Sequence, residues 1–293
     1  MKKISIGCSR LIKKIGLEDA LALIKRSGFD AVNFELQNYY VSTSPYFGSD
    51  DEFESCFRNI KKVADDLELE IAHTHGMCGT FMPDNETHNN QVVKLTKKDL
   101  HATSLLGAPS CVVHFINSSR WDKQPPELMH RICGEMYDSF IPAAEKYKVN
   151  IAMETFGAAR IKGARIRDFF SDPVEFKRQY ERLDTKYKTI CVDTGHTNLA
   201  TNMGYPSVGD VIRYLGDLVE VLHMHDNNGI KDQHKILGTG IIDWKDVFAA
   251  LDEIGYAGYY NLETMLKHYG DGFEEAEAEF SAKVLKHMLK IKN

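Results

Sequence analysis

Short apolar segments alternate with longer amphipathic ones along the whole of this 293-residue chain. The short segments are rich in β-branched residues and predict buried strands, whereas the longer ones have the apolar period of helices. Strands are predicted at Ile4–Cys8, Ala31–Leu36, Glu70–His75, Cys111–Phe115, Asn150–Thr155, Thr189–Thr194, Val219–Asp226 and Gly258–Thr264. Helices are predicted at Leu17–Ser27, Asp51–Leu67, Asn90–Leu106, Pro126–Tyr147, Pro173–Leu183, Val208–Leu215, Trp244–Ile254 and Glu274–Ile291.

Eight strands that alternate with eight helices predict an α/β fold, a closed (β/α)8 TIM barrel. The 43% hydrophobic content suffices for one sizeable core, and no linker divides the chain, so residues 1–293 are predicted to form a single domain. An open doubly wound sheet is the competing fold. The segment SIGCSRL after the first strand lacks the GxGxxG turn typical of such sheets, which favours the barrel.

The charge balance and the cysteines limit the function classes. With 36 Lys and Arg against 42 Asp and Glu, the net charge of -6 provides no broad cationic field, which makes nucleic acid an unlikely partner. No apolar run approaches the roughly 18 residues of a membrane span, and the start MKKISIGCSRLIKK lacks the apolar region of a signal peptide. Six cysteines are scattered without C-x-x-C spacing, so we expect a reduced, cytoplasmic protein; homo-oligomerisation is left open.

Side chains that can bind a metal end six consecutive predicted strands, where a barrel of this kind builds its active site. In chain order they are His73 and His75, His114, Glu154, Asp193 with His196 one turn later, His225, and Glu263. Any one histidine alone is equally explained as a packing residue. An unpaired carboxylate in an apolar strand costs several kcal/mol, however, and a bound cation removes that cost. The mixed nitrogen and oxygen donors predict a catalytic divalent ion rather than a structural zinc site.

The segment that follows the seventh strand offers a second pair of ligands. Asp232 and His234 lie two residues apart, so both face the same side if the chain is extended there. Gly238 and Gly240 supply turn conformations that other residues resist. A solvated polar loop is the alternative interpretation of this segment.

At these positions the sequence resembles the sugar phosphate isomerase/epimerase family of xylose-isomerase-like barrels, which shares its fold and metal motifs with the endonuclease IV family. The segments that carry the resemblance are ICVDTGH (Ile190–His196), LHMHDNNGIKDQHKILGTGIIDW (Leu222–Trp244) and LET (Leu262–Thr264). The resemblance implies a principal divalent ion, Mn, Mg, Co or Zn. Its ligands would be Glu154, Asp193, His225 and Glu263.

The resemblance also implies roles for an outer set of residues. His196 would contact substrate. In the endonuclease branch additional zinc ions are held at the positions that match His75, His114, His196, Asp232 and His234. The number of metal ions therefore stays open. The family's third strand ends in a histidine followed by small residues, which favours His75 over His73, although HTHGMCG departs from the usual H-A-P pattern.

The predicted reaction starts with proton abstraction beside a metal-bound carbonyl and passes through an enediolate. Glu154 and Glu263 are the predicted acid/base pair, because their strands would bring them to opposite sides of a sugar. We therefore predict a sugar or sugar-phosphate isomerase or epimerase. A dehydratase or β-eliminase begins with the same step and is an alternative, as are an endonuclease IV-like zinc phosphodiesterase and a non-enzymatic sugar-binding protein.

Candidate substrate contacts follow three of the strands. The loop after the fifth strand carries four cations that are predicted to bind a phosphate or carboxylate, unless the loop is only solvated or faces a subunit. They are Arg160, Lys162, Arg165 and Arg167. Aromatic rings after the second and fourth strands are predicted to stack on a sugar or, alternatively, to pack in the core. These are Tyr39, Tyr40 and Trp121.

Overall fold

Eight parallel strands form the central sheet of the protein in a computed structural model, which describes residues 2–117, 124–157, 159–161, 164–166 and 168–290. Their order around the sheet is β10-β1-β2-β3-β4-β5-β8-β9. The strands are β1 (Ile4–Gly7), β2 (Ala31–Glu35), β3 (Glu70–His75), β4 (Ser110–Val113), β5 (Asn150–Glu154), β8 (Lys188–Asp193), β9 (Val219–His223) and β10 (Tyr260–Leu262). A parallel bridge between Met224 and Leu262 brings the two ends of the sheet together. The predicted (β/α)8 barrel is therefore confirmed.

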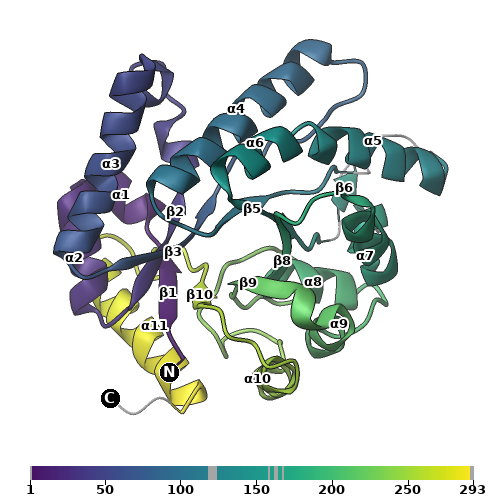
Figure 1. The fold of residues 1–293 in the computed structure, drawn as a ribbon. Helices are drawn as coiled ribbons and strands as arrows, with labels where there is room; N and C mark the ends of the chain where they lie inside the picture. The colour runs from purple at the N-terminus through teal and green to yellow at the C-terminus, as the bar shows by residue number, and fades with distance from the viewer. Residues whose placement is uncertain (1, 118–123, 158, 162–163, 167, 291–293) are drawn as a thin grey trace.

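Helices surround the strands on the outside of the barrel, and the two ends of the chain lie near each other at one end of it (Figure 1). The helices are α1 (Ser9–Ile15), α2 (Leu17–Arg26), α3 (Asp50–Asp66), α4 (Glu86–Leu105), α5 (Pro126–Asp138), α6 (Ile141–Tyr147), α7 (Pro173–Arg182), α8 (Thr194–Thr201), α9 (Val208–Leu215), α10 (Trp244–Glu253) and α11 (Glu274–Met288). Short 3-10 turns are η1 (Leu36–Tyr39), η2 (Pro45–Phe47), η4 (Phe169–Ser171) and η5 (Gly216–Leu218). None of the helices that the structure describes is long and apolar enough to cross a bilayer.

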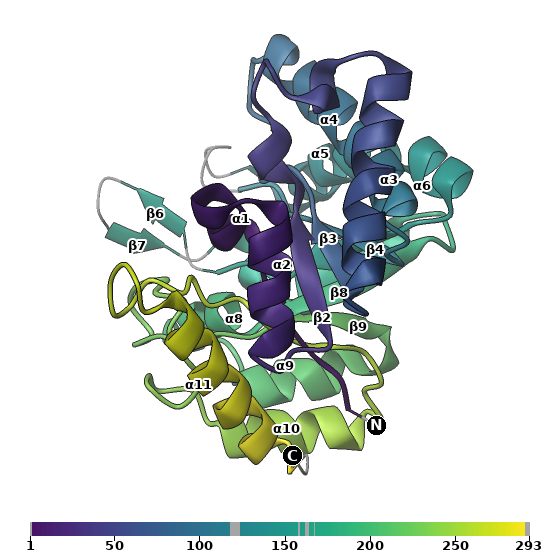
Figure 2. The same cartoon turned by 90° about the vertical axis from the view of Figure 1, so that its left-hand side faces the viewer.

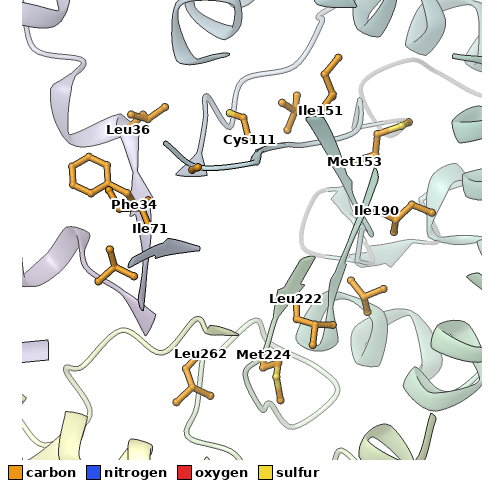
Figure 3. Packing of buried hydrophobic residues seen from close by; sticks show 14 of the residues in the cluster. Phe34, Leu36, Ile71, Cys111, Ile151, Met153, Ile190, Leu222, Met224 and Leu262 are labelled. Carbon is orange, nitrogen blue, oxygen red and sulfur yellow. The ribbon is translucent and has the colours of Figure 1, made fainter. Parts of the chain in front are cut away.

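The main core lies between the strands and the surrounding helices. Figure 3 shows side chains such as Phe34, Met153 and Ile190 directed outward from their strands into this layer. Because successive strand residues point to opposite faces, the neighbours of these residues face the barrel interior. Met224 belongs to the outer core, so His223 and His225 on either side of it point inward.

The structure differs from the predicted elements in three places. The predicted helix Pro126–Tyr147 is two helices, because Pro142 lacks an N–H and its ring would clash with the carbonyl of Asp138, where α5 ends. Helices α1 and α8 were not predicted; each begins within two residues of the end of a strand and is under ten residues long. The predicted cationic loop contains an antiparallel hairpin of β6 (Ala159–Ile161) and β7 (Ala164–Ile166), which projects from the barrel in Figure 2.

Candidate metal centre

Glu154, the last residue of β5, lies at the centre of the polar side chains inside the barrel. Its carboxylate is buried, with Oε1 2.9 Å from Nδ1 of His223 and Oε2 2.7 Å from Nε2 of His114. Burial alone would raise the pKa of Glu154, but the two histidines outweigh it and hold that pKa well below its usual range. Glu154 is therefore an anion inside the barrel.

Asp193 ends β8 and has two roles at that point in the chain. It caps α8, because Oδ1 accepts the backbone N–H of His196 at 2.6 Å. Both carboxylate oxygens lie 3.2 Å from Nε2 of His225. The cap explains why the chain turns into a helix directly after the strand, and it fixes the carboxylate beside His225.

Glu263 follows β10, which flanks β9 on the side opposite to β8, and it approaches the histidines of and after β9. Its Oε2 lies 3.6 Å from Nδ1 of His223, 3.7 Å from Nδ1 of His234 and 4.0 Å from Nε2 of His225. Burial, together with the negative charges of Asp193 and Glu154, raises the pKa of Glu263 well above its usual range. Three carboxylates so close together repel one another, and a divalent cation would offset that repulsion.

Four side chains offer ligand atoms that all lie within 4.8 Å of one another: Glu154, Asp193, His223 and Glu263. A second group of this kind contains His225, His234 and Glu263. Nδ1 of His225 is buried and forms no hydrogen bond with the residues that the structure describes. Imidazole and carboxylate donors with an unsatisfied buried nitrogen fit a Mn, Mg, Co or Zn ion.

His223 is a residue that the sequence interpretation missed. The predicted set of four contained His225, and the structure places His225 against Asp193 and near Glu263. The group of four whose ligand atoms all lie within 4.8 Å of one another contains His223 instead. Both histidines face inward from the sequence LHMH, so alternation alone gives no choice between them. His225 as principal ligand stays a prediction.

The residues of the predicted outer set lie on two sides of the group that contains Glu154 and Glu263. Nε2 of His75 is 3.8 Å from Oε2 of Glu154, on the side of His114. On the other side Asp232 contacts His196 at 3.6 Å and His234 at 3.2 Å. His73 also faces inward, but it contacts Nε2 of His223 at 3.1 Å rather than a carboxylate. Of the two histidines of β3, His75 is thus the one placed to share a cation with Glu154.

Two of the predicted substrate contacts, Tyr39 and Tyr40, can be compared with the structure by their side chains. Trp121, Lys162 and Arg167 lie outside the described residues. Arg160 and Arg165 are backbone partners in the β6–β7 hairpin. The ring of Tyr39 packs against Phe34 and Phe57, and the hydroxyl of Tyr40 donates to buried Asp99 at 2.5 Å. For these two tyrosines the structure favours packing, the alternative to sugar stacking.

A cavity of about 620 Å³ opens beside Glu263 and His234. It lies between α1 and the loop after β10, and cations line part of its wall: Arg10, Lys13, Lys14 and Lys267. Glu35 forms another part, and its carboxylate accepts the N–H groups of Cys8 and Ser9 at 3.1 and 2.8 Å. These two hydrogen bonds fix the backbone where α1 begins. The cavity has the size and the mixed lining of a site for a small polar molecule.

A family model described as xylose isomerase-like TIM barrel matches residues 21–288. The chain belongs to this family. The resemblance stated from the ICVDTGH, LHMHD and LET segments is thereby confirmed. Among the relatives of this xylose isomerase-like barrel is the uncharacterised protein y4fM of Sinorhizobium fredii. It is 23% identical over 281 residues, which cover 87% of this chain and 83% of the relative.

Solved structures similar to this barrel include two sugar epimerase folds. A D-tagatose 3-epimerase-like protein superposes with a TM-score of 0.75 at 22% identity; the match covers 99% of this chain and 97% of that protein. An L-ribulose 3-epimerase superposes with a TM-score of 0.75 at 18% identity; the match covers 99% of this chain and 95% of that enzyme. At these identities the likeness establishes the fold.

Proposed function

We propose that the protein is a divalent-metal-dependent isomerase or epimerase of a sugar or sugar phosphate. The observation that carries the proposal is the position of Glu154 and Glu263 in one group of ligand atoms, reached from the separate strands β5 and β10. The cavity opens beside Glu263. The epimerase names of the similar folds support the same reaction class.

We assign the proton transfers to the two glutamates. A substrate in the cavity reaches Glu263 first, because this residue lines the cavity wall. One carboxylate removes the proton from the carbon beside the carbonyl, and the other returns a proton to the neighbouring atom or to the opposite face. The divalent ion that Glu154, Asp193, His225 and Glu263 are proposed to hold would supply Lewis-acid stabilisation of negative charge on the substrate. We assign contact with a substrate hydroxyl to His196, whose backbone N–H donates to Asp193 and whose Nε2 lies 3.6 Å from Asp232.

Exchange of substrate hydrogen with solvent tests this assignment. Glu154→Gln and Glu263→Gln remove the base but keep the size of the side chain, so each should abolish deuterium incorporation from D2O into a bound ketose or its phosphate. Glu70→Gln is the matched control, since Glu70 is exposed at the opposite end of β3 and should leave exchange intact. Exchange that persists in both active-site variants rules the mechanism out. A product that lacks one water molecule or another leaving group of the substrate would instead identify the dehydratase or β-eliminase.

A zinc phosphodiesterase of the endonuclease IV type is the second candidate. It is favoured by the additional nitrogen and oxygen donors beside the central group: His75 and His114 on one side, and His196, Asp232 and His234 on the other. Several adjacent divalent ions are the usual machinery of phosphodiester hydrolysis. Cleavage of an abasic DNA duplex by the zinc-loaded protein, without exchange on any sugar, would select this function.

A further inference from the structure

A cysteine adjoins the outer histidines in the loop that follows β3. Sγ of Cys78 lies 4.0 Å from Nδ1 of His75, and the ligand atoms of His75, Cys78 and His114 all lie within 4.8 Å of one another. Of the six free cysteines, Cys78 is the exposed one. Two imidazoles and a thiol at this spacing are a donor set for a metal ion.

The loop holds Cys78 in this position through bonds that do not involve the histidines. Asp99 of α4 accepts the backbone N–H of Met77 at 3.0 Å, next to the cysteine. The side-chain amide of Gln37 donates to Sγ of Cys78 at 2.7 Å. An N–H donor directed at sulfur stabilises the thiolate, which is the form of cysteine that binds metal. Residues that hydrogen-bond to metal ligands commonly orient them in this way.

A buried carboxylate lies next to these residues and offers a further donor. Oε2 of Glu154 is buried, and it lies 2.7 Å from Nε2 of His114 and 3.8 Å from Nε2 of His75. The contact with His114 partly balances this buried charge, and a metal ion bound by the two imidazoles would balance it in its place.

We propose that the Cys78 thiolate is a metal ligand, which binds a second ion together with His75 and His114. Glu154 lies between this site and the group that contains Asp193 and Glu263. Nitrogen and sulfur donors select Zn or Co and disfavour Mg and Mn, so the site takes a different class of ion from one built of carboxylates. When the ion binds, the thiol releases its proton to solvent. The proposed isomerase chemistry needs one ion only, so this site goes beyond it.

Cobalt titration tests the thiolate. Metal-free protein titrated with Co²⁺ should develop a sulfur-to-cobalt charge-transfer band in the near ultraviolet and bind two ions per chain. Cys78→Ser should lose the band and bind one ion. The matched control is Cys56→Ser, because Cys56 is a partly exposed thiol on α3 outside the cluster and should keep both properties. A band that survives in Cys78→Ser, or a single ion in the wild-type chain, would overturn the proposal.

Alkylation gives a second measurement that needs no variant. Zinc should slow the reaction of Cys78 with iodoacetamide at least tenfold, while the rate at Cys56 in the same sample stays constant. Equal rates at Cys78 with and without zinc contradict its role as a ligand. The isomerase proposal is tested separately by the exchange experiment with Mn or Mg, so one proposal can fail while the other stands.

Discussion

Gly195 leaves the space that the imidazole of His225 occupies. A Cβ atom at position 195 would lie 1.8 Å from Cε1 and 2.4 Å from Nε2 of His225. A glycine is needed at position 195 for space and not for its backbone conformation, because the φ angle of Gly195 is not positive. The glycine of the DTGH segment thus lets the histidine ring approach both oxygens of Asp193 at 3.2 Å.

Gly195→Ala should therefore weaken metal binding at the centre. The added methyl group must push the His225 ring away from Asp193, at a cost of about 1–3 kcal/mol for overpacking. Calorimetric titration with Mn²⁺ should show a lower affinity for the ion, and thermal unfolding of the metal-free protein should show a lower stability. Gly134→Ala in α5 is the control, because its Cβ would meet only Nε2 of Gln179, at 3.6 Å, and a helical alanine is favourable. Unchanged Mn²⁺ affinity in Gly195→Ala would contradict the steric argument.

Asp226→Asn should destabilise the protein through the loop that carries Asp232 and His234. The buried carboxylate accepts the N–H groups of Asn227, Gly238 and Ile242 and the indole N–H of Trp244; the distances are 2.8, 3.0, 3.3 and 2.9 Å. An amide would turn an NH2 group toward two of these donors, which costs about 3 kcal/mol. Urea unfolding measures the loss.

The control for this loop is Asp243→Asn. Asp243 is the exposed N-cap of α10, where Asn and Asp serve equally well, so the free energy of unfolding should change by less than about 0.5 kcal/mol. Equal effects of the two substitutions would mean that the buried network does not order the loop.

The barrel follows from the sequence because its signals are repeated and local. Apolar segments such as Asn150–Glu154 fix both the strand and the inward direction of its last side chain, so the strand-end residues converge as predicted. The choice between His223 and His225 depends on their distances to carboxylates from other strands, which no local pattern contains.

Cys78 shows why part of the site could not be predicted. It lies in a loop, and its approach to His114 depends on Asp99, which is 22 residues beyond Met77 and holds the backbone there. The cationic loop of Arg160 and Arg165 likewise contained no clear signal for the hairpin that the two strands form. The position of Cys78 depends on a contact with a distant segment, and the hairpin consists of two very short strands. Local secondary-structure propensity predicts neither reliably.

Asp99 should make the stability of the metal-free protein depend on pH. Burial raises its pKa from 3.8 to about 7, even though it accepts hydrogen bonds from Tyr40 and Tyr46. The native state then binds more protons than the unfolded chain between pH 4 and 7. Stability from this group is complete below about pH 4 and is lost as the pH rises through 7, by about 4 kcal/mol. Asp99→Asn mimics the neutral acid and should flatten that slope; an identical slope would contradict the assignment.

Lys13→Gln and Lys267→Gln should distinguish phosphorylated from neutral substrates. Both lysines line the cavity beside Glu263. Lys14 of the same wall is held by Asp271 and Glu274, whereas no ion pair found in the described part of the chain involves Lys13 or Lys267.

Loss of one charge-assisted contact to a phosphate costs about 1.5–3 kcal/mol, so KM for a sugar phosphate should rise at least tenfold while KM for the free sugar stays constant. Lys283→Gln on α11, which lies outside the cavity lining, should change neither value. Equal KM changes for both substrates would show that the cations do not recognise a phosphate.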